Sequence, residues 1–170
     1  RLGLASFMTE NPIWISSLAP ALLSHPEDAT DHNLPLMYWF GIRDLPPAEL
    51  RKLFAGCRIP LVRQFIARRV TEEIDKDPAP LNTLLTLARN GDASSPASKS
   101  KGGEAPPLLD SFPADILRGM TDALKGWRKA KKPEAWAAFV ARHSDVGTGS
   151  TPDPTSESRA TLLRDLNVLF

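Results

Sequence analysis

The sequence is poor in the residue types that build covalent and metal-bound sites. It contains one cysteine among 170 residues, which excludes an internal disulfide framework, a cysteine-based zinc site and a Cys-x-x-Cys-His haem attachment within this stretch. No apolar run approaches the roughly 20 residues that span a bilayer. An excess of one charge is also lacking, because 21 Lys and Arg stand against 20 Asp and Glu. The composition therefore gives no reason to expect binding to nucleic acid or insertion into a membrane.

Catalytic motifs are lacking as well. The three histidines are scattered, and the sequence shows neither a Ser-His-Asp arrangement nor a phosphate-binding glycine loop. Paired catalytic carboxylates cannot be picked out among the 20 acidic residues. We therefore expect no catalytic, cofactor-binding or metal-binding residue in this chain.

Proline is abundant, at 16 residues, and its positions indicate helices. Many prolines stand at or just before the start of a helical pattern, where the missing N–H costs nothing and the fixed φ suits the first turn. Pro20 is the exception, because it falls inside a pattern and should kink that helix. The prolines at helix starts are Pro12, Pro35, Pro47, Pro60, Pro80, Pro113 and Pro133.

The apolar residues recur at helical spacing, and no stretch alternates as a strand would. The segment 33–45 is apolar all round, which predicts a buried central helix that contains Trp39, a candidate packing or interface residue. The stretches 91–107 and 144–158 are rich in Ser, Gly and Pro and are predicted to be flexible loops. The predicted helical segments are 1–9, 13–24, 33–45, 48–57, 61–74, 81–89, 112–128, 134–142 and 158–169.

If these helices are grouped in pairs, each pair begins about 40 residues after the previous pair, which is within the repeat length of HEAT and armadillo proteins. A short helix pair cannot bury its apolar face alone, so it stacks on its neighbours. We therefore predict an all-α fold, a single HEAT-like α-solenoid over residues 1–170, with an irregular helical bundle as the alternative. Because Arg1 opens the chain and apolar residues close it at Phe170, we expect a fragment of a longer protein.

A polar cluster precedes the segment 33–45. Asp28, Asp31, His32 and Asn33 could form a metal or substrate cluster, but a metal site would need further ligands at fixed spacing. The simpler interpretation is that Asp31 or Asn33 caps the helix by accepting hydrogen bonds from its free N–H groups. His32 would then contact a neighbouring repeat.

Two features of the segments 48–57 and 61–74 concern partly buried groups. Cys57 lies on an apolar stripe, which favours a buried, inert thiol over a nucleophile.

Arg69 and Glu73 are four residues apart inside an apolar arc, and a half-buried charge there needs a partner. We predict either an ion pair at the junction between repeats or, if the arc extends past the core, two solvated side chains.

The segment 112–128 has the clearest apolar stripe, which includes Trp127, while Asp115 is placed on the opposite, charged face. Gly119 and Gly126 project at nearly the same angle beside the stripe. Each costs about 1 kcal/mol of helix propensity relative to Ala, so we predict that both allow a neighbouring helix to approach closely.

The only basic run follows at the end of this segment. With Trp127 it resembles a nucleic-acid-binding patch. However, Trp127 belongs to the apolar stripe, and cations at a helix C-terminus also suit the helix dipole. We therefore expect no nucleic-acid partner. The run comprises Lys125, Arg128, Lys129, Lys131 and Lys132.

Three strings in the sequence are distinctive: DHNLPLMYWFGI, RIPLVRQFIARRV and LRGMTDALKGWRKAKKPEAW. They resemble the helical-repeat region of large planctomycete-type haem-binding proteins, described as membrane-bound dehydrogenase-like or haem-binding Cys-x-x-Cys-His proteins. The resemblance covers roughly residues 1–142. Its motifs are packing motifs, so it transfers no catalytic or haem-binding residue to this chain.

The resemblance implies a place between two redox modules. In that family a β-propeller resembling sugar dehydrogenases precedes the HEAT-like region, and a cytochrome c domain follows. It implies a periplasmic or cell-envelope scaffold that is not itself an enzyme, with haem c elsewhere in the parent chain and the flanking domains as partners. The alternatives are a stand-alone α-solenoid that binds a protein or peptide and, third, a nucleic-acid-binding helical repeat.

Overall fold

The computed structural model describes residues 2–10, 14–90, 112–127, 129–144 and 154–170. Within these residues the chain forms nine α-helices, one short 3-10 helix and no strand, which confirms the predicted all-α fold. The helices are α1 (Leu2–Glu10), α2 (Ile15–Leu23), η2 (Pro26–Thr30), α3 (Leu34–Ile42), α4 (Pro47–Gly56), α5 (Pro60–Glu72), α6 (Ala79–Asn90), α7 (Phe112–Leu124), α8 (Trp136–Ser144) and α9 (Pro154–Leu169).

Proline marks where several helices begin, as predicted. Pro35, Pro47 and Pro60 occupy the first turn of α3, α4 and α5, where no intrahelical N–H bond is lost. Pro20 lies inside α2. None of the described helices has the length and apolar character needed to cross a membrane.

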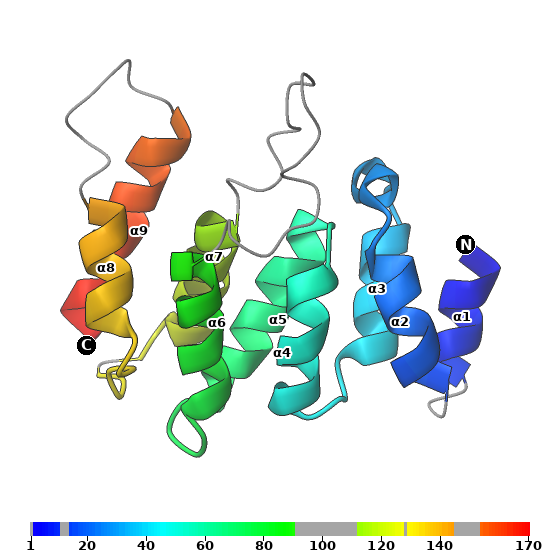
Figure 1. Cartoon of the computed structure of the whole chain (residues 1–170), viewed down its shortest axis with the longest axis horizontal. Helices are drawn as coiled ribbons and strands as arrows, with labels where there is room; N and C mark the ends of the chain where they lie inside the picture. Colours follow the sequence, from blue (N-terminus) through cyan, green and yellow to red (C-terminus); the bar gives the residue numbers. More distant parts are fainter. Residues whose placement is uncertain (1, 11–13, 91–111, 128, 145–153) are drawn as a thin grey trace.

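The helices lie in two layers. The odd-numbered helices α1, α3, α5, α7 and α9 each pack on the next, and the even-numbered helices α2, α4, α6 and α8 do the same. In Figure 1, α4 and α6 lie in front of α5 and α7, and the two ends of the chain lie at opposite ends of the row. Each short helix therefore buries its apolar side against neighbours in both layers.

The tightest packing is between α5 and α7. A Cβ atom added to Gly119 would lie 2.5 Å from the carbonyl oxygen of Gln64 and 2.7 Å from Cβ of Ala67. Only glycine fits there, because part of the obstruction is backbone. The predicted close approach of a helix at Gly119 is therefore confirmed.

The same prediction is wrong for Gly126. The helix ends at Leu124, two residues earlier, and Gly126 has φ +88° with no atom within 4 Å of an added Cβ. A glycine with positive φ just beyond a helix is a common way to terminate it. Gly126 therefore terminates α7, and its lack of a side chain does not serve the close approach of another helix.

The predicted burial of the segment 33–45 on all sides is also wrong. Tyr38 and Ile42 are fully buried, but Leu36 is 39% exposed and Phe40 is 52% exposed. Neighbours α1, α2 and α5 cover only part of the surface of α3. One side of α3 is therefore an apolar surface open to solvent.

The loop predictions have different outcomes. The predicted loop 91–107 lies outside the described residues. The loop predicted at 144–158 is shorter than expected, because α8 continues to Ser144 and α9 begins at Pro154. Proline suits the first helical position, which explains why α9 begins so early.

A buried ion pair joins α5 to α7. Arg63 and Asp115 are each 1% exposed at their side chains, and Arg63 Nη2 lies 2.5 Å from Asp115 Oδ2. Arg63 also donates to the carbonyl oxygen of Cys57 at 3.1 Å, and Gln64 donates to the other carboxylate oxygen at 3.1 Å. The sequence places Asp115 on the charged face of α7, opposite the apolar stripe, but this position is buried because α5 covers it.

Candidate binding groove

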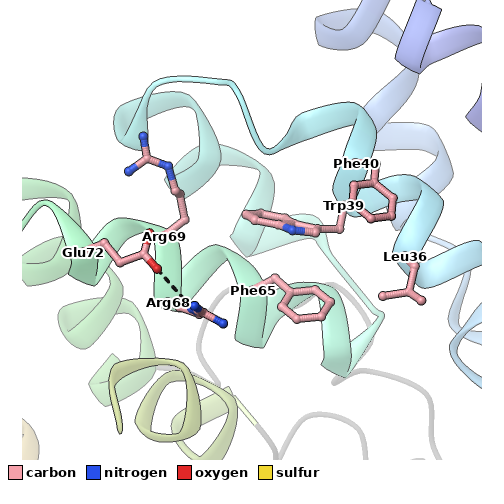
Figure 2. Close-up of a pocket in the computed structure, with 7 residues that line it drawn as sticks. All are labelled: Leu36, Trp39, Phe40, Phe65, Arg68, Arg69 and Glu72. Atoms are coloured by element: carbon pink, nitrogen blue, oxygen red, sulfur yellow. Dashed lines mark hydrogen bonds and ion pairs between the residues drawn. The ribbon is translucent and has the colours of Figure 1, made fainter. Parts of the chain in front are cut away.

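A groove of about 360 Å³ opens between α3 and α5. Figure 2 shows its lining residues, three from α3 and four from α5. The α3 residues are three and four positions apart, a spacing that places their side chains on one side of the helix. The lining comprises Leu36, Trp39, Phe40, Phe65, Arg68, Arg69 and Glu72.

Two aromatic rings link the walls of the groove. The centroids of Trp39 and Phe65 are 5.4 Å apart with 31° between the ring planes. Beside them, Phe40 is about half exposed, and the guanidinium carbon of Arg43 lies 5.2 Å from its ring centroid. The groove therefore presents aromatic and aliphatic surface to solvent, which can accept an apolar or aromatic side chain.

Two ion pairs border the α5 side of the groove. Arg68 Nε lies 3.0 Å from Glu72 Oε1, the pair marked by the dashed line in Figure 2. Arg69 Nη1 lies 2.6 Å from Glu73 Oε1, with side chains 31% and 26% exposed, so the two residues do pair, while their predicted place at a junction between repeats stays a prediction. In each pair the two residues are four positions apart, and their opposite charges neutralise each other.

The predicted cap on α3 is present, and Asp31 makes it. Oδ1 of Asp31 accepts hydrogen bonds from the backbone N–H groups of Leu34 at 2.9 Å and Asn33 at 2.8 Å. These two hydrogen bonds hold the pKa of Asp31 below its usual value. The Asn33 side chain makes no capping hydrogen bond, and His32 is exposed.

The fourth polar residue of that cluster has a different role. Asp28 is buried, and its Oδ2 accepts a hydrogen bond of 2.8 Å from the hydroxyl of Tyr38. This contact ties η2 to α3. In the part of the chain that the structure describes, no group of three or more His, Cys, Asp or Glu is placed to hold a metal ion.

Cys57 is buried, as predicted, and its thiol donates to the carbonyl oxygen of Ile59 at 3.5 Å. Burial raises the pKa of this thiol to about 11. Because the thiolate is the reactive species, we expect no reaction with a disulfide reagent such as Ellman's at pH 8 in the folded protein. One thiol per chain should react after unfolding in guanidinium, and one equivalent released at once from folded protein would contradict this.

Trp127 and the four lysines of the basic run follow the last residue of α7, Leu124. Trp127 is half-buried and packs against the core, so only part of its ring faces solvent. The backbone N–H of Ala130 donates to the carbonyl oxygen of Leu169 at 3.0 Å, which fixes this connector to the end of α9. Arg128 lies outside the described residues. The exposed lysines are Lys125, Lys129, Lys131 and Lys132.

Of the residues singled out from the sequence, the structure brings only Trp39 and Arg69 together at the groove. The apolar pattern of the sequence does not indicate that Leu36, Phe40 and Phe65 line a groove. The spacing of 36, 39 and 40 shows that they share a helix side, but an all-apolar segment does not indicate which side stays uncovered.

Comparison of the chain with protein-family models, with curated proteins and with solved structures found no match.

Proposed function

We propose that this chain is a non-catalytic helical scaffold that docks a peptide segment of another protein or domain in the groove between α3 and α5. The observation that carries the proposal is an open, aromatic-lined groove on a stack of short helices. Ligand sites are typically concave and lined by apolar and aromatic side chains with a few polar groups, and this groove has that composition. The occupant is a peptide with one or two large apolar side chains, because the groove volume fits side chains of that size.

The two-layer packing supports a finer interpretation as a HEAT-like α-solenoid. In such a protein each helix pair contacts chiefly its neighbours, and a row of helices presents an extended binding surface. Packing of each odd helix on the next odd helix, and each even helix on the next even one, agrees with that plan. The exposed large apolar residues Leu36, Phe40 and Leu61 all lie in the odd layer.

The parent protein is proposed from the resemblance of the three sequence strings alone. On that basis the chain is the helical middle of a haem-containing, dehydrogenase-like protein of the periplasm or cell envelope. Haem c would be held elsewhere in the parent, and the flanking propeller and cytochrome c domains would be the partners. A haem absorbance band from the 170-residue chain, purified after expression with haem maturation proteins, would contradict this assignment.

A stand-alone peptide-binding solenoid is the second candidate, because the same groove serves it equally well. The two candidates differ only in where the docked segment comes from. The reading frame around this chain distinguishes them, because a downstream Cys-x-x-Cys-His motif supports the first candidate and its absence supports the second.

The groove is tested by peptide binding. We would select peptides from a phage-displayed 12-residue library on the folded chain, and measure the affinity of a selected peptide by fluorescence anisotropy. Phe40→Ser removes a half-exposed ring from the groove, so it should weaken binding at least tenfold, as loss of an aromatic anchor does. It should change the melting temperature by no more than about 3 °C, because little buried contact is lost.

Val168→Ser is the matched control, because Val168 is also an exposed apolar residue but lies on α9, far along the chain from the groove. It should leave peptide affinity unchanged. Selected peptides that bind the Phe40→Ser variant as tightly as the parent would show that the groove is not the docking site.

A further inference from the structure

The groove between α3 and α5 is walled by helices that run in the same direction. Each helix is joined to α4 by a short turn, at 43–46 and at 57–59, and a short turn between helices reverses the direction of the chain. On α5 the lining positions 65, 68, 69 and 72 form one stripe along the helix. This stripe spans about 10 Å from its first position to its last. The groove therefore runs along the helices for about two helical turns.

The walls offer almost no hydrogen-bonding partner to a peptide backbone. Along the middle of α3 and α5 the backbone N–H and C=O groups bond to one another within each helix. Among the apolar side chains of the lining, only Trp39 carries a donor, its indole N–H. An extended peptide against this wall would lose water from backbone groups that the wall does not replace, which is unfavourable. A helix avoids this cost because its backbone groups are paired internally.

The groove is apolar on one side and charged on the other. In Figure 2 its apolar side chains lie in the centre and on the right, and its charged side chains lie on the left. Among the residues that the structure describes, Glu72 pairs with Nε of Arg68, and Glu73 pairs with Nη1 of Arg69. A guanidinium carries five N–H donors, so both arginines keep donors for a further carboxylate. The charged side therefore complements an Asp or Glu side chain of the occupant.

We propose that the occupant of the groove is an amphipathic α-helix of another protein or domain, with two large apolar side chains one turn apart and an acidic side chain about one turn further along. This inference rests on the proposed function of the groove as a docking site, and it adds the conformation and the chemistry of the partner. The apolar side chains lie against Trp39 and Phe65, and the carboxylate lies beside Arg68. Helices that dock in grooves present their contacts at this spacing, i, i+3 or i+4 and i+7.

Proline substitution in the peptide tests the helical conformation. The probes are the selected 12-residue peptides whose binding is weakened by Phe40→Ser. Proline at a central peptide position that alanine scanning shows to be free of contact should weaken binding at least tenfold, because proline breaks a helix. Alanine at the same position is the control and should leave the affinity unchanged. Circular dichroism at 222 nm should show that helix is gained when the complex forms.

Arg68→Gln tests the charged side of the groove. It should weaken binding of a peptide that carries Asp or Glu about one turn beyond its apolar pair by about two- to fivefold, the usual effect of an exposed ion pair. It should leave unchanged the affinity of the same peptide with Asn or Gln at that position. Arg118→Gln is the matched control, because Arg118 is an exposed arginine of α7 that does not line the groove.

Two results would overturn the proposal. One is that Phe40-dependent peptides tolerate the central proline and gain no helix signal, because the groove would then bind an extended segment. The other is that these peptides lack the acidic residue or bind the Arg68→Gln variant with unchanged affinity. In both cases the groove remains a docking site. Peptides that bind the Phe40→Ser variant as tightly as the unchanged chain would instead overturn the docking proposal, and this one with it.

Discussion

Replacing Asp115 by asparagine is expected to lower the free energy of unfolding by about 3–5 kcal/mol, the usual cost of leaving one charge of a buried ion pair without its partner. The guanidinium of Arg63 would stay buried beside the aromatic ring of Phe112. The guanidinium carbon of Arg63 lies 4.4 Å from the centroid of that ring. The remaining hydrogen bond to the carbonyl of Cys57 does not neutralise that charge. Urea unfolding followed by circular dichroism at 222 nm measures the change.

The control for Asp115→Asn is Glu49→Gln, which removes the carboxylate of an exposed pair with Lys52 at 2.7 Å. Surface pairs contribute about 0–1 kcal/mol, so this variant should unfold almost as the parent does. The double variant Arg63→Met/Asp115→Leu should recover most of the loss, because an apolar pair often replaces a buried ion pair at little cost. Equal stability of Asp115→Asn and Glu49→Gln would show that Asp115 is solvated.

Replacing Gly119 by alanine is the second substitution with a large expected effect. In most helices this change stabilises by about 1 kcal/mol. Here the added Cβ would meet the Gln64 carbonyl oxygen and the Arg68 backbone nitrogen, neither of which can move without shifting α5. We expect a net loss of about 1–3 kcal/mol, as for other overpacked cores, measured by the same urea titration.

Gly56→Ala is the matched control for Gly119→Ala. Gly56 is the last residue of α4, and no atom lies within 4 Å of a Cβ added there. This variant should be as stable as the parent or slightly more stable. A Gly119→Ala variant that gains stability in the same way would contradict the close packing of α5 on α7.

The helices could be predicted from the sequence because their signals are local. Pro35, Pro47 and Pro60 mark the starts of three helices within one or two residues of the observed ones. Apolar spacing located all nine helical segments of the described chain. The end of α7 was misplaced because Gly126 can either pack against a helix or terminate one, and only its backbone conformation decides between these roles.

Long-range contacts could not be predicted in the same way. Arg63 and Asp115 are 52 positions apart, and nothing in either helical pattern indicates that the polar side of α7 is covered by α5. Burial of Asp115 depends on this tertiary packing, as does exposure of Phe40. The groove was missed for the same reason, because its two walls come from helices whose relative placement the sequence does not specify.

The central claim is that the surface between α3 and α5 is a docking site on a two-layer helical scaffold. Hydrogen exchange of the 170-residue chain, measured by mass spectrometry with and without a selected peptide, tests it most directly. The claim predicts slower exchange in Leu34–Ile42 and Pro60–Glu72, with α4, α6 and the lysine-rich connector 129–133 unchanged. Slower exchange confined to the connector or to the even-numbered helices would contradict it.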